Sequence, residues 1–294
     1  MTEIDTLDAR SISSSAILVD YTLGTPSKKI KAGQKTHEVQ QKEETTALTV
    51  NKEPYKGTNI DAITSHHTEV RKNVDTIYTL PWTKGGSKLL PMASYEDFIG
   101  YITKAKTKHD ELVEEFRRDI PLMVERAPDR LKKLFDPRDY PDPDSEDSVD
   151  AFMSRFKFEY YFEPVPESGD FRVNVGNSAM KELKQGFGKI LENRLETGKN
   201  SLWARGYDIL KEWQDMPNKS TVSKTTVHTK AENLVKLIDK ANLTGDTDLK
   251  RLRDDLEEIV KSTNIHMLRD KDCRDMEKDL LAEKARNVLS KFDF

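Results

Sequence analysis

The chain has 294 residues, of which 34% are charged and 35% belong to the set AVILMFWYC, and its mean hydropathy is −0.74. This composition favours long, solvent-exposed helices over a protein with a large globular core. The net charge of −4, from 48 basic and 52 acidic residues, excludes an overall positive field that would recruit nucleic acid or an anionic membrane. Any such contact would have to be local.

Compartment and membrane contact can also be predicted from composition. The single cysteine, Cys273, excludes an intramolecular disulfide framework and is typical of a reducing compartment. The sequence has no apolar run near 18 residues, and its start, MTEIDTLDAR, lacks the basic and apolar regions of a signal peptide. We therefore expect a soluble, cytoplasmic protein without a membrane partner.

Two stretches have the pattern of β-strands. Ala16 to Gly24 is rich in β-branched and aromatic residues and is followed by a Thr-Pro-Ser turn signal. In the stretch 156–175, apolar residues alternate with polar ones on both sides of Pro164-Val-Pro-Glu-Ser-Gly-Asp, which predicts a β-hairpin. Because a two-stranded ribbon alone is marginal in water, we expect the early strand to pair with the hairpin.

Residues 27–55 are polar and show no sustained period, so they are predicted to be a flexible connection. The predicted division of the chain is therefore an N-terminal strand with a flexible polar segment, 1–55, and a helical domain, 56–294, that carries the hairpin at 156–175. A small basic cluster could touch phosphate: Lys28, Lys29, Lys31 and Lys35. A solvated loop is the favoured reading, because no aromatic residue interleaves with these lysines.

The first half of the remaining chain contains two helical patterns. Asn59 to Tyr78 has apolar residues on one side, and the stretch Leu80 to Pro91 that follows is predicted to be a loop because prolines and glycines bound it. Ser94 opens the clearest helix, Tyr95 to Met123, in which apolar residues keep 3-4 spacing as in a coiled coil. Pro121 predicts a kink or break near Asp119, and Arg126 to Phe135 a separate short helix.

The second half contains four more amphipathic patterns. They are Ser178 to Met216, Thr229 to Ala241, Asp246 to Ser262 and Ile265 to Phe292. We expect Tyr95 to Met123 to pack antiparallel on the first of them. The predicted fold class is mainly α: an elongated antiparallel helical bundle with a coiled-coil-like hairpin and a small antiparallel β element.

Motifs with a catalytic or metal-binding mechanism are not found in the sequence. There is no phosphate-binding loop, nucleophile elbow or HExxH motif, so we expect no catalytic residues, cofactor or metal. His66 and His67 with Glu69 could contribute to a metal site, but they lack a further ligand at suitable spacing, and polar helix surface is the favoured reading. His109 lies at a core position of its heptad, where a buried, hydrogen-bonded histidine is favoured over a ligand.

The order of features resembles the phage and bacterial family DUF3150, a domain of unknown function. The matching stretches are ILVDYTLGTPSKK, the PW-x-x-GG-x-x-LLP segment, FKFEYYFEPVPESGDFRVNV, and Leu202-Trp-Ala-Arg-Gly-Tyr-Asp-Ile-Leu with the helices after it. The resemblance implies a phage-encoded protein that acts with a MoxR-like AAA+ ATPase and a von Willebrand A-domain protein. It supplies no catalytic residues, and it leaves virion association open.

The leading functional hypothesis is therefore a non-enzymatic interaction or assembly protein that works with the ATPase. A nucleic-acid-binding protein of phage replication or recombination is the alternative, in which the lysine cluster would join a local basic track. The further members of that track are Arg117, Arg118, Arg130, Lys132 and Lys133. An enzyme is a third, less favoured class, because residues distant in sequence would have to converge.

The hairpin also predicts assembly. Tyr161 interrupts the polar side of its first strand, so one face could form an exposed patch for a second copy or a partner, with Tyr161, Arg172 and Asn174 on the contacted side. In the alternative, Tyr161 packs against the early strand and exposes nothing.

Overall fold

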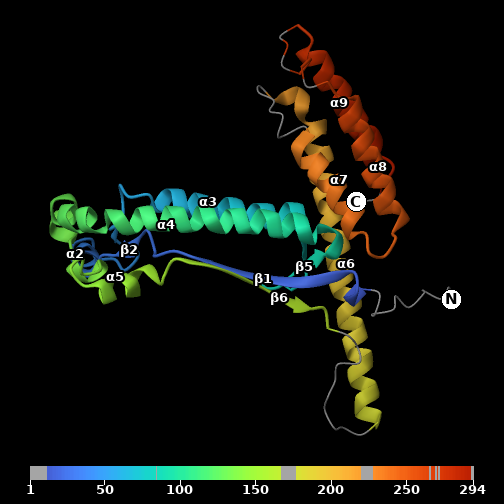
Figure 1. Ribbon diagram of the computed structural model, residues 1–294. Helices are drawn as coiled ribbons and strands as arrows, with labels where there is room; N and C mark the ends of the chain where they lie inside the picture. Colours follow the sequence, from blue (N-terminus) through green and yellow to red (C-terminus); the bar gives the residue numbers. More distant parts are fainter. Residues whose placement is uncertain are drawn as a thin grey trace. The chain divides into compact units, whose positions relative to one another are not determined.

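The computed structural model describes residues 12–83, 85–166, 177–219, 228–264, 266–268, 270 and 272–292 (Figure 1). These residues form a mainly helical protein with a small antiparallel β element, which confirms the predicted fold class. They divide into two compact units. Unit 1 contains the described residues up to 20, those from 73 to 98 and those from 161 onward, and unit 2 contains 21–72 and 99–160.

The described part of the chain contains eight α-helices. They are α2 (Gly33–Lys42), α3 (Ile60–Asn73), α4 (Tyr95–Leu131), α5 (Glu146–Met153), α6 (Asn177–Gln214), α7 (Lys230–Ala241), α8 (Thr247–Ser262) and α9 (Arg274–Leu289). Its strands are β1 (Ala16–Gly24), β2 (Ile30–Lys31), β3 (Asn51–Lys52), β4 (Leu80–Pro81), β5 (Lys88–Pro91) and β6 (Lys157–Pro164). Along these ranges, no helix is both long and apolar enough to cross a membrane.

Four of the strands form one sheet in the order β4-β5-β1-β6. β1 has the predicted bounds and lies next to β6, as expected for a strand that supports the hairpin. The second predicted hairpin strand, 171–175, lies outside the described residues. The prediction of a loop from Leu80 to Pro91 is wrong, because β4 and β5 pair antiparallel there and β5 also pairs with β1. The turn signals mark the short connection between two strands whose leucines are buried.

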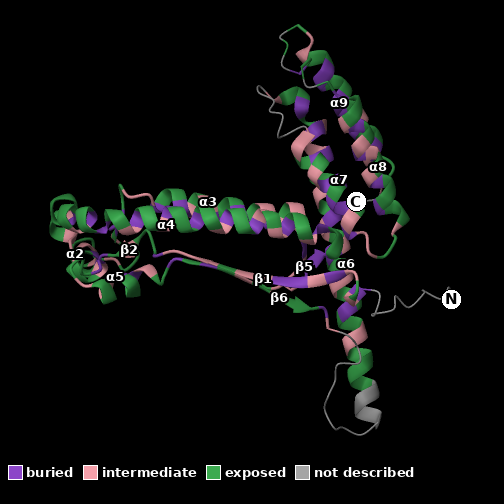
Figure 2. Cartoon of the chain, viewed as in Figure 1, coloured by how far each residue is buried: buried purple, intermediate pink, exposed green. Residues whose placement is uncertain are grey.

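Unit 2 has a core built on aromatic rings around α4. The ring of Phe116 lies 4.9 Å from that of Phe156 and 6.1 Å from that of Phe152, and Tyr55 packs edge-on against Phe152 at 5.5 Å. Figure 2 shows buried and exposed positions alternating along α4, as a 3-4 apolar stripe requires. The sequence pattern predicts α6 as the partner of this stripe, whereas the structure covers it with α3, α5 and β6.

Proline did not end α4 where the sequence predicts. The helix continues through Pro121 and Pro128 to Leu131, so the expected break near Asp119 and the separate helix from Arg126 are both wrong. Ile120, Met123 and Ala127 are buried in the same cluster as Phe116. Packing of this stripe offsets the hydrogen bond that each proline removes.

Regular structure also occurs in residues 27–55, contrary to the prediction of a flexible connection. α2 and the two-stranded β2-β3 ribbon lie there, and the Thr36 hydroxyl joins them by accepting a hydrogen bond from the Val50 N–H at 3.0 Å. Lys52 forms a largely buried ion pair with Asp139 at 2.5 Å. These polar contacts stabilise the segment, although its sequence lacks the apolar periodicity of a packed helix or strand.

Unit 1 has its core between α6 and the three helices that follow (Figure 1). Trp213, Leu210 and Leu202 of α6 are fully buried against them, as the apolar stripe of this segment predicts. α7 and α8 begin within two residues of their predicted starts, whereas α9 begins at Arg274 and not near residue 265. α6 itself is continuous from Asn177 to Gln214.

A candidate peptide-binding cleft

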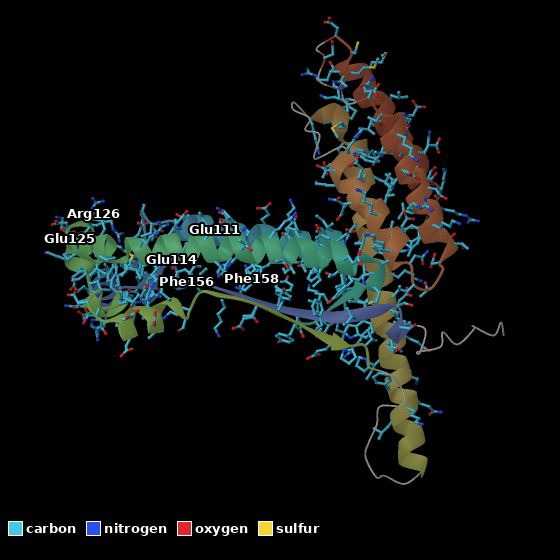
Figure 3. All side chains as sticks on the ribbon, in the orientation of Figure 1. Glu111, Glu114, Glu125, Arg126, Phe156 and Phe158 are labelled. Atoms are coloured by element: carbon cyan, nitrogen blue, oxygen red, sulfur yellow. The ribbon has the colours of Figure 1, made fainter. Side chains whose placement is uncertain are left out.

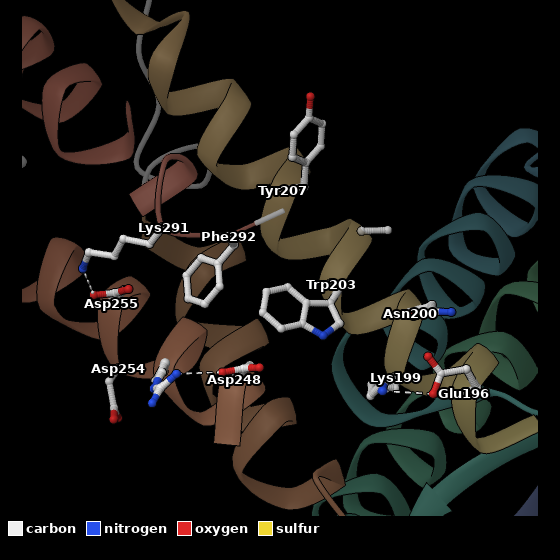
Figure 4. A pocket seen from close by; sticks show the side chains of 12 residues that line it. Glu196, Lys199, Asn200, Trp203, Tyr207, Asp248, Asp254, Asp255, Lys291 and Phe292 are labelled. Carbon is white, nitrogen blue, oxygen red and sulfur yellow. Dashed lines mark hydrogen bonds and ion pairs between the residues drawn. The ribbon is translucent and has the colours of Figure 1, made fainter. Parts of the chain in front are cut away.

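An open cleft of about 1200 Å³ lies in unit 1 between α6 and α8 (Figure 4). The α6 wall is made by side chains at positions i, i+3, i+4, i+7, i+8 and i+11, which is one face of a helix. They are Glu196, Lys199, Asn200, Trp203, Ala204 and Tyr207. This face is adjacent to the buried stripe of α6, so the helix uses one side for the core and the next for the cleft.

The facing wall is the exposed side of α8. Its lining residues are Asp248, Arg251, Asp254 and Asp255, again at helical spacing. Asp246 fixes the start of α8, because its carboxylate accepts hydrogen bonds from the N–H groups of Asp248 at 2.9 Å and Leu249 at 3.0 Å. Below the cleft, Gly206 allows α8 to approach α6 closely, since a Cβ at this position would lie 2.7 Å from Leu252 Cδ2.

Most charges of the cleft have a partner of opposite charge. Lys199 Nζ lies 3.0 Å from Glu196 Oε2, and this hydrogen bond raises the pKa of Lys199 above its usual value. Arg251 Nη1 lies 2.9 Å from Asp248 Oδ1. The carboxylate of Asp254 lies 2.9 Å from Arg253 Nη1, which is outside the cleft. Asp255 is different, because its partner comes from beyond α9.

Residues just after α9 contact both walls of the cleft. Lys291 Nζ lies 2.7 Å from Asp255 Oδ1 on α8, and the Phe292 ring lies 5.2 Å from Trp203 on α6 with an interplanar angle of 61° (Figure 4). Tyr207, one turn along from Trp203, is 36% exposed. An open site with aromatic rings and fixed charges can bind amino-acid side chains. The residues that line it include no nucleophile paired with a base.

Unit 2 contains a different polar cluster, the buried histidines. His67 Nε2 and His109 Nδ1 are 2.9 Å apart and share one hydrogen bond, while the His66 ring bonds to the Ala105 carbonyl at 2.8 Å. Burial lowers the pKa of His67 and of His109 to about 4, so both rings are neutral near pH 7. The centroids of the Phe158 and His109 rings are 5.3 Å apart. Figure 3 labels Phe158 together with Phe156, which directly precedes β6.

The predicted buried role of His109 is therefore confirmed. The prediction of polar helix surface for His67 is wrong, since only 2% of this residue is exposed. Its partner lies 42 residues away, and sequence spacing along α3 could not find it. No group of three or more histidine, cysteine, aspartate or glutamate side chains within the described ranges could hold a metal ion.

The predicted partner-binding residues are only partly described. Tyr161 in β6 is 51% exposed, which contradicts the alternative in which it packs away completely. Arg172 and Asn174 lie outside the described residues, so the contacted face that they were predicted to form with Tyr161 stays a prediction.

Two of the four lysines predicted to contact phosphate form ion pairs, and the other two are exposed. Lys28 pairs with Asp61 and Lys35 with Glu38, both at 2.8 Å, while Lys29 and Lys31 are exposed. In the proposed basic track, Arg117 pairs with Asp150 at 2.6 Å. Arg130 donates to the carbonyls of Glu53 and Pro54, Lys132 pairs with Asp129, and Arg118 and Lys133 are exposed.

The cleft itself was not predicted from sequence. A signal was present, because Trp203 and Tyr207 are four residues apart and lie off the stripe that contains Leu202 and Ile209. Two aromatic residues at helical spacing outside the buried stripe indicate a second functional face. The α8 wall carries no comparable signal, since charged residues at that spacing are typical of any exposed helix.

Comparison with known proteins finds no matching family model, no matching curated protein and no matching solved structure.

Proposed function

We propose that this chain is a non-enzymatic, phage-encoded interaction protein that acts in the host cytoplasm as an accessory partner of a MoxR-like AAA+ ATPase. The observation that carries the proposal is the cleft between α6 and α8, with Trp203 on one wall and Asp255 on the other. Aromatic residues beside fixed charges are enriched at protein-binding hot spots. The resemblance to DUF3150 supplies the class of partner.

The geometry supports binding of a protein segment better than catalysis. The cationic side chains on the two walls, Lys199 and Arg251, are held by neighbouring carboxylates. Fixed ion pairs of this kind orient a polar partner and reject mismatched charges, which gives specificity. The ATPase would supply the chemical energy, and this chain would supply the contact.

Binding to a MoxR-like AAA+ ATPase tests the proposal. The two proteins are mixed without nucleotide, with ADP and with a non-hydrolysable ATP analogue, and binding is measured by surface plasmon resonance. We expect a complex in at least one nucleotide state, weakened tenfold or more by Trp203→Ala. Met92→Ala is the control, because Met92 is 44% exposed and lies outside the cleft.

Absence of a complex in all three nucleotide states would overturn the ATPase partnership. A complex that Trp203→Ala leaves intact and Tyr161→Ala abolishes would move the contact from the cleft to the β6 patch. The same experiment thus also tests the predicted role of Tyr161.

A further inference from the structure

The N-terminal half of α6 has a second stripe, which is exposed. Along residues 183–200 it follows the 3-4 spacing of a coiled-coil seam. Its members are all exposed: Leu183, Gly186, Ile190, Asn193, Thr197 and Asn200. Leu183 is 40% exposed and Ile190 is 49% exposed, although both side chains are large and aliphatic. An exposed stripe with this spacing indicates a surface that packs against another helix.

Charged residues are absent from this stripe. Between residues 182 and 199 the sequence has seven charged residues, and all of them lie at other positions of the heptad. The residues of α6 that face the unit 1 core, such as Leu191 and Leu202, lie on a different side of the helix. Packing of the core therefore does not explain why the exposed stripe is uncharged.

The stripe is accessible from one end to the other. A Cβ added at Gly186 would meet no neighbouring atom within 4 Å. At the other end, Asn200 lines the open cleft. The Thr197 hydroxyl donates a hydrogen bond to the Asn193 carbonyl at 2.8 Å, so Thr197 can face another helix without an unpaired donor.

The stripe is complementary to itself when a second copy of the helix runs antiparallel to it. In this arrangement each layer of the seam sets a larger side chain against a smaller one. The layers pair Leu183 with Asn200, Ile190 with Asn193, and Thr197 with Gly186 of the second copy. A two-fold axis then passes between residues 191 and 192, and every contact occurs twice.

The charges beside the stripe favour the same orientation. Antiparallel pairing places Lys189 of each copy beside Glu196 of the other, which gives two attractive pairs between exposed residues. Parallel pairing would place Lys189 beside Arg194 of the second copy, and these charges repel each other. Glu196 lies 3.0 Å from Lys199 of its own helix, and a carboxylate can accept hydrogen bonds from both cations.

We propose that a second copy of this chain docks on the exposed stripe of α6, residues 183–200, to form an antiparallel dimer with two-fold symmetry. The proposal goes beyond the proposed function, since self-association requires no ATPase. The seam is short and includes polar side chains, so we expect reversible association with a Kd of about 10 to 100 µM.

Sedimentation equilibrium of the full-length protein tests the proposal. As its concentration rises from about 1 to about 300 µM, the average mass of wild type should increase from 33.8 kDa towards twice this value. Ile190→Asp should weaken association by about tenfold or more, because it places a carboxylate at the centre of the seam in both copies. Ile190 is exposed in the single chain, so the variant should fold normally, which circular dichroism checks.

Exchanged charges test the antiparallel contact itself. Lys189→Glu and Glu196→Lys should each weaken association by about tenfold, because two attractive pairs become two repulsive ones. An equimolar mixture of these two variants should recover the association of wild type, because the pairs between unlike copies are again attractive. Lys184→Glu and Glu192→Lys are the matched controls, since they change the net charge equally at exposed positions off the stripe.

A wild type that stays monomeric at every concentration would overturn the proposal. A mixture of the charge variants that associates no more tightly than either variant alone would do the same, as would full association of Ile190→Asp. No ATPase is present in this assay, so its outcome is independent of the ATPase binding experiment. Loss of the dimer would leave the ATPase partnership standing, and absence of an ATPase complex would leave the dimer standing.

Discussion

At the scale of single residues, a buried ion pair stabilises unit 2. Lys52 and Asp139 are 6% and 12% exposed, and Lys52 Nζ also donates to the Leu134 carbonyl at 3.1 Å. Both charges have lost most of their hydration, so each depends on the other. Lys28 and Asp61 form a pair at 2.8 Å with 43% and 73% exposure, and water still solvates both.

Lys52→Met should therefore lower the free energy of unfolding by about 3 kcal/mol, because it leaves the carboxylate of Asp139 buried without its partner. Adding Asp139→Asn should recover at least half of this loss. Lys28→Met is the control and should change stability by less than about 1 kcal/mol. Urea denaturation of the four proteins measures these differences. Equal losses for Lys52→Met and Lys28→Met would contradict the importance of burial.

At the scale of the element, α6 shows how one helix serves two surfaces. Its buried stripe packs on α7, α8 and α9, and the adjacent face forms a wall of the cleft. Gly206 lies close to α8, because a Cβ at this position would be 2.7 Å from Leu252 Cδ2, so that side chain would have to move. Gly188 of the same helix is open, since a Cβ there would meet no described atom within 4 Å.

Alanine at these two glycines should have opposite effects. Gly188→Ala should stabilise the protein by up to about 1 kcal/mol, the usual gain in helix propensity. Gly206→Ala has the same gain, but its methyl group would displace the buried Leu252, which costs about 1 to 3 kcal/mol, so a net loss is expected. Thermal unfolding followed by circular dichroism distinguishes the two variants. A stabilised Gly206→Ala would show that Leu252 can move aside at little cost in free energy.

At the scale of the whole molecule, the described residues form two hydrophobic cores with different chemistry. The unit 1 core is largely aliphatic with Trp213 among its leucines, and the unit 2 core is richer in aromatic rings, which are those of Tyr55, Phe116, Tyr140, Phe152 and Phe156. Unit 2 also contains the neutral pair of His67 and His109. The stability of the folded molecule should consequently depend on pH through unit 2.

Acid should destabilise the protein between about pH 6.5 and pH 4. In the unfolded chain a histidine takes up a proton near pH 6.5, whereas burial lowers the pKa of His67 and His109 to about 4 in the folded protein. The unfolded state therefore binds more protons in this window, and stability falls as pH falls, by on the order of 2 kcal/mol per histidine at pH 5. Above about pH 7 the pair contributes no pH dependence.

Urea denaturation at pH 7.5 and pH 5 measures this loss. His67→Leu with His109→Leu should reduce the difference between the two pH values, because the titrating groups are gone. His37→Gln is the control, since His37 is exposed and should retain the wild-type difference. If the double leucine variant kept the full wild-type difference, groups other than His67 and His109 would cause the pH dependence of stability.

Apolar periodicity and turn residues were sufficient to predict the helical fold class and most long elements. β1 at Ala16–Gly24, α4 from Tyr95 and the α6 stripe up to Trp213 were all found in this way. These features depend on neighbours within a few turns, so the local sequence determines them. The buried state of His109 was predictable for the same reason, from its place in the heptad.

Contacts between distant residues were decided only by the tertiary structure. The order in 27–55 depends on partners such as Asp139, the continuity of α4 through Pro121 depends on the packing of its stripe, and His67 became a core residue only because His109 faces it. The cleft required α6, α8 and the residues after α9 to converge. Local periodicity shows which face of a helix is apolar, but the identity of the element that covers it depends on the free energy of packing the whole chain.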